Sequence, residues 1–130
     1  MKCLSLKQPF AELLASGKKK IELRNWNTMF RGEFLIHASR NINKDACKSI
    51  GLDSSTIATG AVIGKAFLYD VKEYYNKKDF DKDKENHLAT DIYSNDRYGF
   101  LVKDAVKFDK PIPMLGKLNF FEVQLDVNRV

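Results

Sequence analysis

The hydrophobic pattern at the start of the chain predicts a short strand followed by a short helix. Residues 3–6, with the sequence CLSL, are predicted to form the strand. The helix is predicted to open at Pro9, because the first helical position does not need the N–H that proline lacks. It is predicted to end at Gly17, since glycine readily adopts the left-handed conformation of a C-terminal cap. A helix of about two turns cannot stand alone, so packing must hold it.

From residue 21 onward, polar and apolar residues alternate with a period of two, which predicts a strand. One row of this strand, Glu22, Arg24 and Trp26, contains a carboxylate acceptor, a forked cation and a large aromatic plane, with about 7 Å between neighbours. Two interpretations remain open for that row: a surface that holds a ligand, or a cross-strand ion pair beside a core tryptophan. The first row is Ile21, Leu23 and Asn25, and the second is Glu22, Arg24 and Trp26.

The middle of the chain predicts a strand, a helix and a long strand. Residues 33–38 alternate as a strand does, and residues 43–50 form a predicted helix with an asparagine as its N-cap and Gly51 as its stop. Residues 60–71 carry the longest strand signal. Gly64 lies inside that signal and predicts a bulge or bend, as a small closing barrel requires.

The last part of the chain begins with a surface excursion and ends in strands. Residues 70–96 are rich in acids and predict helices or loops over the surface, and residues 98–102 predict a strand. The stretch PIPMLGKLNFFEVQL predicts a Pro-x-Pro turn, a kink at Gly116 and a last strand over about 119–125. Strands outnumber helices without regular alternation. The fold class is therefore expected to be α+β, a small mixed β-barrel with short helices packed around it.

Length and composition bound the function. A chain of 130 residues is expected to form a single domain, residues 1–130. It has no apolar run of the roughly 20 residues that a membrane span needs and no signal-peptide core, so we expect a cytoplasmic protein without a membrane partner. Cys3 and Cys47 suggest neither a disulfide nor a zinc site. Phosphate-loop, dinucleotide and nucleophile-elbow motifs are missing from the sequence, and we expect no cofactor and no metal.

The net charge of +5 is concentrated in the first third of the chain. Up to residue 40 there are eight basic and three acidic residues, and the remaining residues balance to zero. Such asymmetry is typical of a surface that faces a polyanion, although a solvated basic edge explains it equally well. The eight basic residues are Lys2, Lys7, Lys18, Lys19, Lys20, Arg24, Arg31 and Arg40, and the acids are Glu12, Glu22 and Glu33.

The constellation of Lys19, Glu22 and Arg24 can serve two kinds of chemistry. In a binding site, the cations would neutralise phosphates while Trp26 stacks on a base. In a catalytic site, a lysine desolvated in a cleft could act as base or nucleophile, with Glu22 moving the proton. The residues alone favour neither reading.

Four residues of this stretch, Gly17, Lys19, Glu22 and Arg24, match the pattern G-x-K-x-x-E-x-R. It resembles the signature of the ASCH domain family, whose fold is similar to the PUA barrel of RNA-modifying proteins. The stretches LSLKQPFAELLASG and RNWNTMFRGEFLIHAS are closest to the ASCH domain of the activating signal cointegrator, and YGFLV and PIPMLGKLNFFEV resemble its closing strands. The resemblance spans nearly the whole chain and implies a PUA-like fold.

The resemblance implies two activities, because the family divides. The cointegrator branch resembles a nucleic-acid-binding module, whereas a bacterial branch hydrolyses N4-acetylcytidine with a lysine and a threonine of G-x-K-T-x-T-x-R and a distant glutamate. Here Lys20 and Glu22 occupy the two threonine positions, and a carboxylate cannot replace a hydroxyl as nucleophile or donor. A ribonuclease activity is also attached to some relatives.

The first hypothesis is therefore a module that binds RNA or single-stranded DNA in a cleft between the Gln8-Pro9 helix start and the strand from residue 21. Lys19 and Arg24 would contact the ligand and Glu22 would orient them, with Trp26 stacking or packing in the core. His37 and Ser39 would face the cleft only if their strand pairs beside that strand, and His37 is otherwise a surface or satisfied core residue. The predicted nucleic-acid-binding residues are Lys7, Gln8, Lys19, Glu22, Arg24, Trp26 and Arg31.

Two other hypotheses remain. The second hypothesis is an enzyme acting on modified nucleosides or RNA, with Lys19 and Glu22 as the proton-transfer pair. A third possibility is a protein-interaction module that docks through the acidic excursion at 70–96. A translation- or transcription-related protein is a further expected partner.

Overall fold

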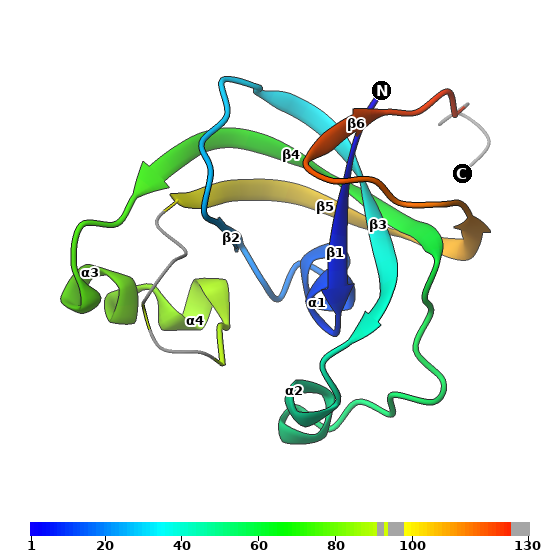
Figure 1. The fold of residues 1–130 in the computed structure, drawn as a ribbon, viewed down its shortest axis with the longest axis horizontal. Coiled ribbons are helices and arrows are strands. Elements are labelled where there is room, and N and C mark those ends of the chain that lie inside the picture. The colour runs from blue at the N-terminus through cyan, green and yellow to red at the C-terminus, as the bar shows by residue number, and fades with distance from the viewer. Residues whose placement is uncertain (91–92, 94–97, 126–130) are drawn as a thin grey trace.

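Six strands form one mixed sheet in the computed structural model, which describes residues 1–90, 93 and 98–125 (Figure 1). The strand order is β2-β5-β4-β3-β1-β6. β1 and β3 are parallel, and every other neighbouring pair is antiparallel. The strands are β1 (Lys2–Gln8), β2 (Ile21–Arg24), β3 (Gly32–Ile42), β4 (Ala61–Glu73), β5 (Tyr98–Pro113) and β6 (Phe120–Glu122), and the short helices are α1 (Phe10–Ala15), α2 (Lys44–Ser49), α3 (Lys77–Lys82) and α4 (Lys84–His87).

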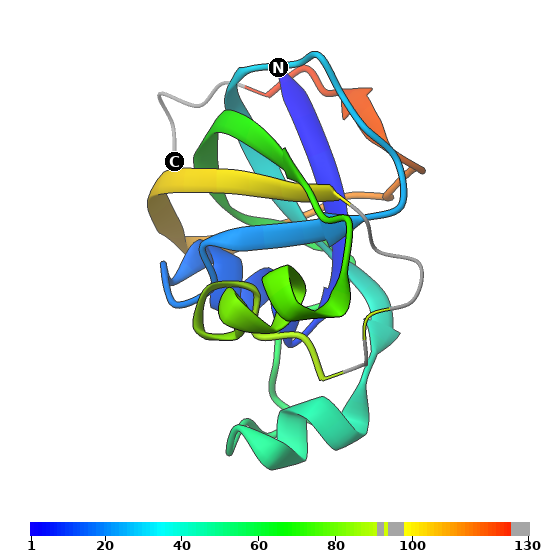
Figure 2. The same cartoon turned by 90° about the vertical axis from the view of Figure 1, so that its left-hand side faces the viewer.

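The α+β class is confirmed, but the closed barrel is wrong. Within the described residues, β2 pairs only with β5 and β6 pairs only with β1, so both remain edge strands. The sheet is strongly curved all the same (Figures 1 and 2). Its curvature brings Trp26, just after β2, to 5.9 Å from Phe120 of β6, measured between ring centroids. Aromatic packing therefore fills the seam that a backbone ladder would close in a barrel.

Both faces of the central strands are buried, and the two faces belong to different hydrophobic clusters. Phe34, Ile36 and Ala38 of β3 lie in the larger cluster together with residues of α1, whereas Leu35 lies in a smaller cluster with Phe121. This matches the predicted alternation of strand 33–38. The helix α1 packs on β1, β3, β4 and β5, which supplies the support that so short a helix needs.

Several local signals in the sequence are confirmed. Gly17 and Gly51 adopt positive φ angles of 81° and 77° after α1 and α2. Asn43 caps α2, and its side chain accepts a hydrogen bond of 3.0 Å from the backbone N–H of Ala46. Gly64 lies where the registers of both neighbouring strands shift, and a Cβ there would lie 2.4 Å from the carbonyl oxygen of Val106. The predicted irregularity at Gly64 is therefore present, and a side chain at this position would clash with β5.

Other boundaries differ from the prediction. Pro9 precedes α1 as its N-cap, so the helix begins one residue later than expected. Residues 111–113 do not form a turn but continue β5, where Pro113 pairs with Ala61 at the end of the sheet. The last strand is shorter than predicted. Pairing with β4 extends β5 through Pro113, so the Pro-x-Pro spacing wrongly predicted a turn at this position.

The acidic excursion from residue 70 is only partly a surface loop. β4 continues through Glu73, and α3 and α4 follow as predicted helices over the surface. Residues 91–92 and 94–96 of this prediction lie outside the described residues. None of the helices in the described part of the chain is long and apolar enough to cross a membrane.

Candidate functional site

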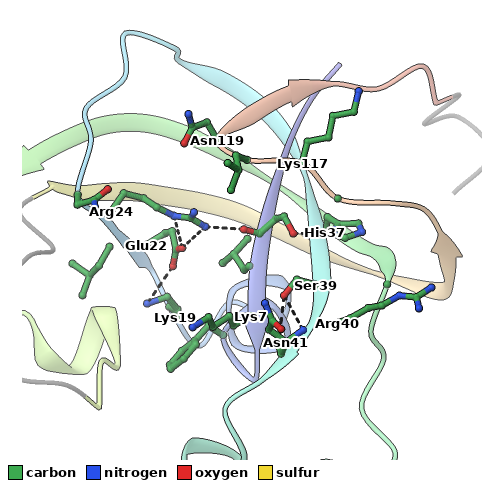
Figure 3. Close-up of a pocket in the computed structure, with 18 of the residues that line it drawn as sticks. Lys7, Lys19, Glu22, Arg24, His37, Ser39, Arg40, Asn41, Lys117 and Asn119 are labelled. Carbon is green, nitrogen blue, oxygen red and sulfur yellow. Dashed lines mark hydrogen bonds and ion pairs between the residues drawn. The ribbon is translucent and has the colours of Figure 1, made fainter.

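A cavity of about 820 Å³ opens between β1, β2, the end of β3 and the loop of residues 114–119, which we call the β5–β6 loop (Figure 3). Its walls come from segments that are far apart in the sequence. β2 forms one side, and the β5–β6 loop forms the opposite side, so the cavity lies near the unpaired edges of the curved sheet. A cavity of this size can hold a small ligand or part of a larger one.

Lys19, Glu22 and Arg24 form a buried ionic cluster on one wall of this cavity. Lys19 is 3% exposed and Glu22 is 7% exposed. The Lys19 Nζ lies 3.6 Å from Glu22 Oε1 and also donates to the carbonyl oxygen of His87. Arg24 directs Nε and Nη2 at Glu22 Oε2, at 2.9 and 2.8 Å, and Nη2 also donates to the carbonyl oxygen of Ser5 at 2.9 Å. Each oxygen of Glu22 thus holds one cation in place.

The backbone explains why only the middle lysine of the run KKK enters the cavity. The Lys20 N–H donates to the carbonyl of Asn86 at 2.8 Å, and the Lys20 carbonyl accepts from Val102 at 3.0 Å. These bonds lead into β2 in an extended conformation, where successive side chains alternate in direction. Lys18 and Lys20 are therefore exposed while Lys19 is buried. The spacing of Lys19, Glu22 and Arg24 predicted their proximity correctly.

Three further cations, Lys7, Arg40 and Lys117, line the cavity; we call them the rim. All three are exposed, and none forms an ion pair with any residue that the structure describes. Arg40 and Lys117 extend away from the ionic cluster toward the outside (Figure 3). The cavity is thus lined by five cationic side chains and one carboxylate, which gives it a strongly positive potential.

Sequence reasoning missed Arg40 and Lys117 as site residues. Arg40 lies in a bulge of β3. Leu6 pairs with Ala38 and Gln8 pairs with Ile42, so β3 has two more residues than β1 over this interval. Bulges often redirect side chains beside functional sites, and no local residue pattern predicts the bulge in β3. Lys117 follows the predicted kink at Gly116, and that kink was the only available signal.

His37 lies at the base of the β5–β6 loop and is 2% exposed. Its Nδ1 is 2.8 Å from the hydroxyl of Ser5, and its Nε2 is 2.7 Å from the carbonyl oxygen of Met114. The expectation of a satisfied core residue fits these contacts. The stated condition for lining the cleft was wrong, however, because β3 pairs with β1 and β4 and not with β2, yet His37 and Ser39 both line the cavity. Curvature brings them there.

Trp26 packs in the core and also reaches the cavity. Its ring packs edge-on against Phe100 at 5.2 Å and against Phe120 at 5.9 Å, between centroids. It is nevertheless only half-buried and lines the cavity. The core contacts hold the indole in one orientation beside the ionic cluster.

Gln8 and Arg31 do not line the cavity, although both were predicted as binding residues. Gln8 is fully buried; its Nε2 donates to the carbonyl of Ala58 at 2.8 Å, and its Oε1 accepts from the N–H of Glu12 at 2.9 Å. Arg31 donates to two carbonyls of its own loop and lies 3.7 Å from Asp70. The hydrogen bonds of Gln8 stabilise the start of α1, and those of Arg31 stabilise its own loop.

His87 contacts the ionic cluster through its backbone carbonyl oxygen, which accepts a hydrogen bond from Lys19 Nζ. Its ring is buried, stacks on Phe80 and lies with Nε2 2.8 Å from the Phe80 carbonyl, while Nδ1 accepts the N–H of Ala89 at 3.0 Å. Burial lowers the pKa of His87, and the neighbouring charge of Lys19 lowers it further. The ring is therefore held neutral. Elsewhere in the described part of the chain, no three His, Cys, Asp or Glu side chains group as metal ligands would.

Comparison with known proteins connects this geometry to a family and a fold. The ASCH domain model matches residues 4–111. The crystal structure of ASCH from Zymomonas mobilis aligns with a TM-score of 0.70 at 16% identity, covering 95% of this chain and 87% of that one. Two mutant proteins of the same ASCH align with TM-scores of 0.69 at 16% identity, covering 95% of this chain and 89% and 87% of theirs. At this identity the likeness concerns the fold. A search of curated proteins found no match.

Proposed function

Because the chain belongs to the ASCH domain family and its cavity carries a large excess of cations, we propose that it is a nucleic-acid-binding module for RNA or single-stranded DNA. The ASCH domain has a PUA-like fold, a fold often linked to RNA binding. The observation that carries the proposal is the composition of the cavity wall, with five cations, one carboxylate and a half-buried indole. This is the chemistry of a site for phosphate and base together.

In this proposal the two groups of cations have different tasks. The rim residues Lys7, Arg40 and Lys117 have no described ion-pair partner, so a phosphate can replace their water and counterions. Arg24, already oriented by Glu22, presents a planar guanidinium suited to a phosphate or a base edge. Trp26 offers an aromatic surface beside it. A duplex would keep its bases stacked away from such a cavity, which favours single strands.

The resemblance supports finer assignments, which we include in the proposal. The stretch RNWNTMFRG favours the branch of the activating signal cointegrator over the branch that hydrolyses N4-acetylcytidine, since Lys20 and Glu22 replace its threonines. We further propose a cytoplasmic role beside a translation- or transcription-related protein. Neither assignment is needed for the binding experiment.

The proposal is tested by titrating the protein with a short single-stranded RNA at low and high salt while following the fluorescence of Trp26, the single tryptophan. We expect quenching and an affinity that falls steeply with salt, because each phosphate contact releases counterions. A variant with Lys48, Lys78 and Lys110 replaced by alanine controls for net charge, since these exposed lysines lie outside the cavity. Absence of binding to any RNA or DNA oligomer at low salt would overturn the proposal.

A second candidate function, hydrolysis of a modified nucleoside or of RNA, is favoured by one observation. The Lys19 Nζ and Glu22 Oε1 lie 3.6 Å apart inside the cavity, an ion-pair contact between the two residues that a proton transfer would require. The other contacts count against it, since Glu22 Oε2 is occupied by Arg24 and Lys19 donates to a backbone carbonyl. Analysis of the RNA recovered from the titration decides the matter: RNA altered by the wild type and left intact by Lys19→Met would establish catalysis.

A further inference from the structure

The β5–β6 loop exposes two leucines at the mouth of the cavity. Leu115 is 79% exposed and Leu118 is 90% exposed, and both line the cavity on either side of Gly116 and Lys117. No other leucine in the described part of the chain is comparably exposed. Single apolar side chains on a surface are ordinary, but two that flank a cation on the wall of a cavity form a mixed apolar and cationic contact surface.

The loop that carries these leucines is held at both ends. At its start, the Met114 carbonyl oxygen lies 2.7 Å from Nε2 of His37, and the Met114 N–H donates to the carbonyl of Gly60. Next to this anchor, Gly116 approaches so closely that a Cβ would lie 2.7 Å from Cε1 of His37. At its end, the loop enters β6, which pairs with β1. The leucines are therefore presented by a fixed scaffold.

Aromatic and amide groups face the same cavity. Trp26 is fixed by its edge-on packing on Phe100 and Phe120, and Asn119, at the end of the loop, also lines the wall. Lys117 extends to the outside of the loop (Figure 3). Around this loop, two leucines, an indole and an amide thus line the cavity, while the side chain of Lys117 extends to the outside. This division matches the two parts of a nucleotide, a flat base and a charged phosphate.

From this division we propose that the β5–β6 loop holds one unpaired nucleotide, with Leu115 and Leu118 covering its base and Lys117 pairing with its phosphate. The inference rests on the proposed nucleic-acid binding and makes it more specific: the leucines of the β5–β6 loop, and not Trp26 alone, contact the base. A polyanion without bases would satisfy the rim but leave both leucines in water. A base that covers them removes apolar surface from water, a gain that does not depend on salt.

The experiment compares a single-stranded RNA with a chain of the same length and charge in which every base is removed. Wild-type protein is expected to bind the base-bearing strand about tenfold more tightly, as the burial of a few apolar groups would give. The variant Leu115→Ser/Leu118→Ser should lose most of that preference while keeping the salt dependence. Lys117→Ala should weaken binding to both strands and lower the salt dependence. Met29→Ser is the matched control, because Met29 is 91% exposed and lies outside the cavity.

The outcomes separate the two proposals. Equal affinity for both strands, or an unchanged preference in the double leucine variant, would overturn the role of the loop while leaving polyanion binding standing. A failure of both strands to bind would overturn the proposed function itself. Thermal unfolding of each variant shows whether it is folded, and the exposure of both leucines predicts an unchanged midpoint.

Discussion

The ionic cluster and the rim contain cations of the same chemical types, yet they are suited to different tasks. Lys19 and Arg24 are held by Glu22 and by backbone carbonyls, so one carboxylate offsets part of their charge and fixes their positions before any ligand arrives. Lys7, Arg40 and Lys117 are exposed and without described ion-pair partners. A buried cation needs its partner for stability, whereas an exposed one is available to a ligand. We infer that the ionic cluster orients a bound nucleic acid and that the rim attracts its phosphates.

The largest effect is expected from Glu22→Gln, which removes the charge that the cluster shares. Two cations, one of them almost fully buried, would then lack their carboxylate, and breaking such a buried pair costs about 3 to 5 kcal/mol. Denaturant unfolding measures the loss. The control is the double variant Lys19→Met/Glu22→Gln, which should recover part of it. A loss below about 1 kcal/mol would mean that the cluster is solvated like the rim.

The next effect concerns binding and not stability. Replacing Lys7, Arg40 and Lys117 together by alanine should weaken single-stranded RNA binding about 10- to 100-fold at low salt and reduce the salt slope by about 2. The free energy of unfolding should change by less than about 0.5 kcal/mol, because the three side chains are exposed. Salt-dependent titration is the measurement. If the triple variant with Lys48, Lys78 and Lys110 replaced behaves identically, the rim has no special role.

A third prediction tests the link between the two regions. Gly116→Ala would place a methyl group 2.7 Å from Cε1 of His37 and 2.9 Å from Oγ of Ser5, so the loop that carries Lys117 must shift. Such overpacking costs about 1 to 3 kcal/mol. We expect both a lower unfolding midpoint and weaker RNA binding. Combining it with Ser5→Ala, which frees space at one contact, should restore part of both. Unaltered stability would show that the loop is not anchored at His37.

The smallest effect is the contribution of His87, next to the ionic cluster, to the pH dependence of the free energy of unfolding. Its pKa is lowered in the folded protein, so below about pH 6.5 the unfolded chain binds a proton that the folded chain does not. The stability that depends on neutral His87 is therefore complete above about pH 6.5 and is lost as the pH falls toward the folded pKa. Asp83, whose pKa is also lowered, acts only at more acidic pH.

Unfolding measured between pH 7.5 and 5 checks this prediction. His87→Gln should flatten the pH dependence in that window, whatever it does to the absolute stability. The slope and not the midpoint is the relevant quantity, because the ring also stacks on Phe80. A slope that is the same in wild type and variant would assign the effect to another group.

The sequence by itself determined the features that depend on neighbours along the chain. Gly17, Asn43 and Gly64 were correctly placed because left-handed caps, asparagine N-caps and glycine bulges are decided by steric and hydrogen-bonding rules within a few residues. The period of two from Ile21 likewise brought Lys19, Glu22 and Arg24 together correctly, since a turn and one short strand contain all three.

Only the tertiary structure decided which distant segments share the cavity. Arg40 lines the cavity beside the register shift between β1 and β3, and Lys117 lines it on a loop whose Met114 carbonyl oxygen contacts His37. Gln8, by contrast, turns inward to bond Ala58, fifty residues away. At the open edges of the sheet, Trp26 packs against Phe120 in place of a backbone ladder. Curvature, register and long-range pairing set these features, and no local pattern in the sequence encodes them.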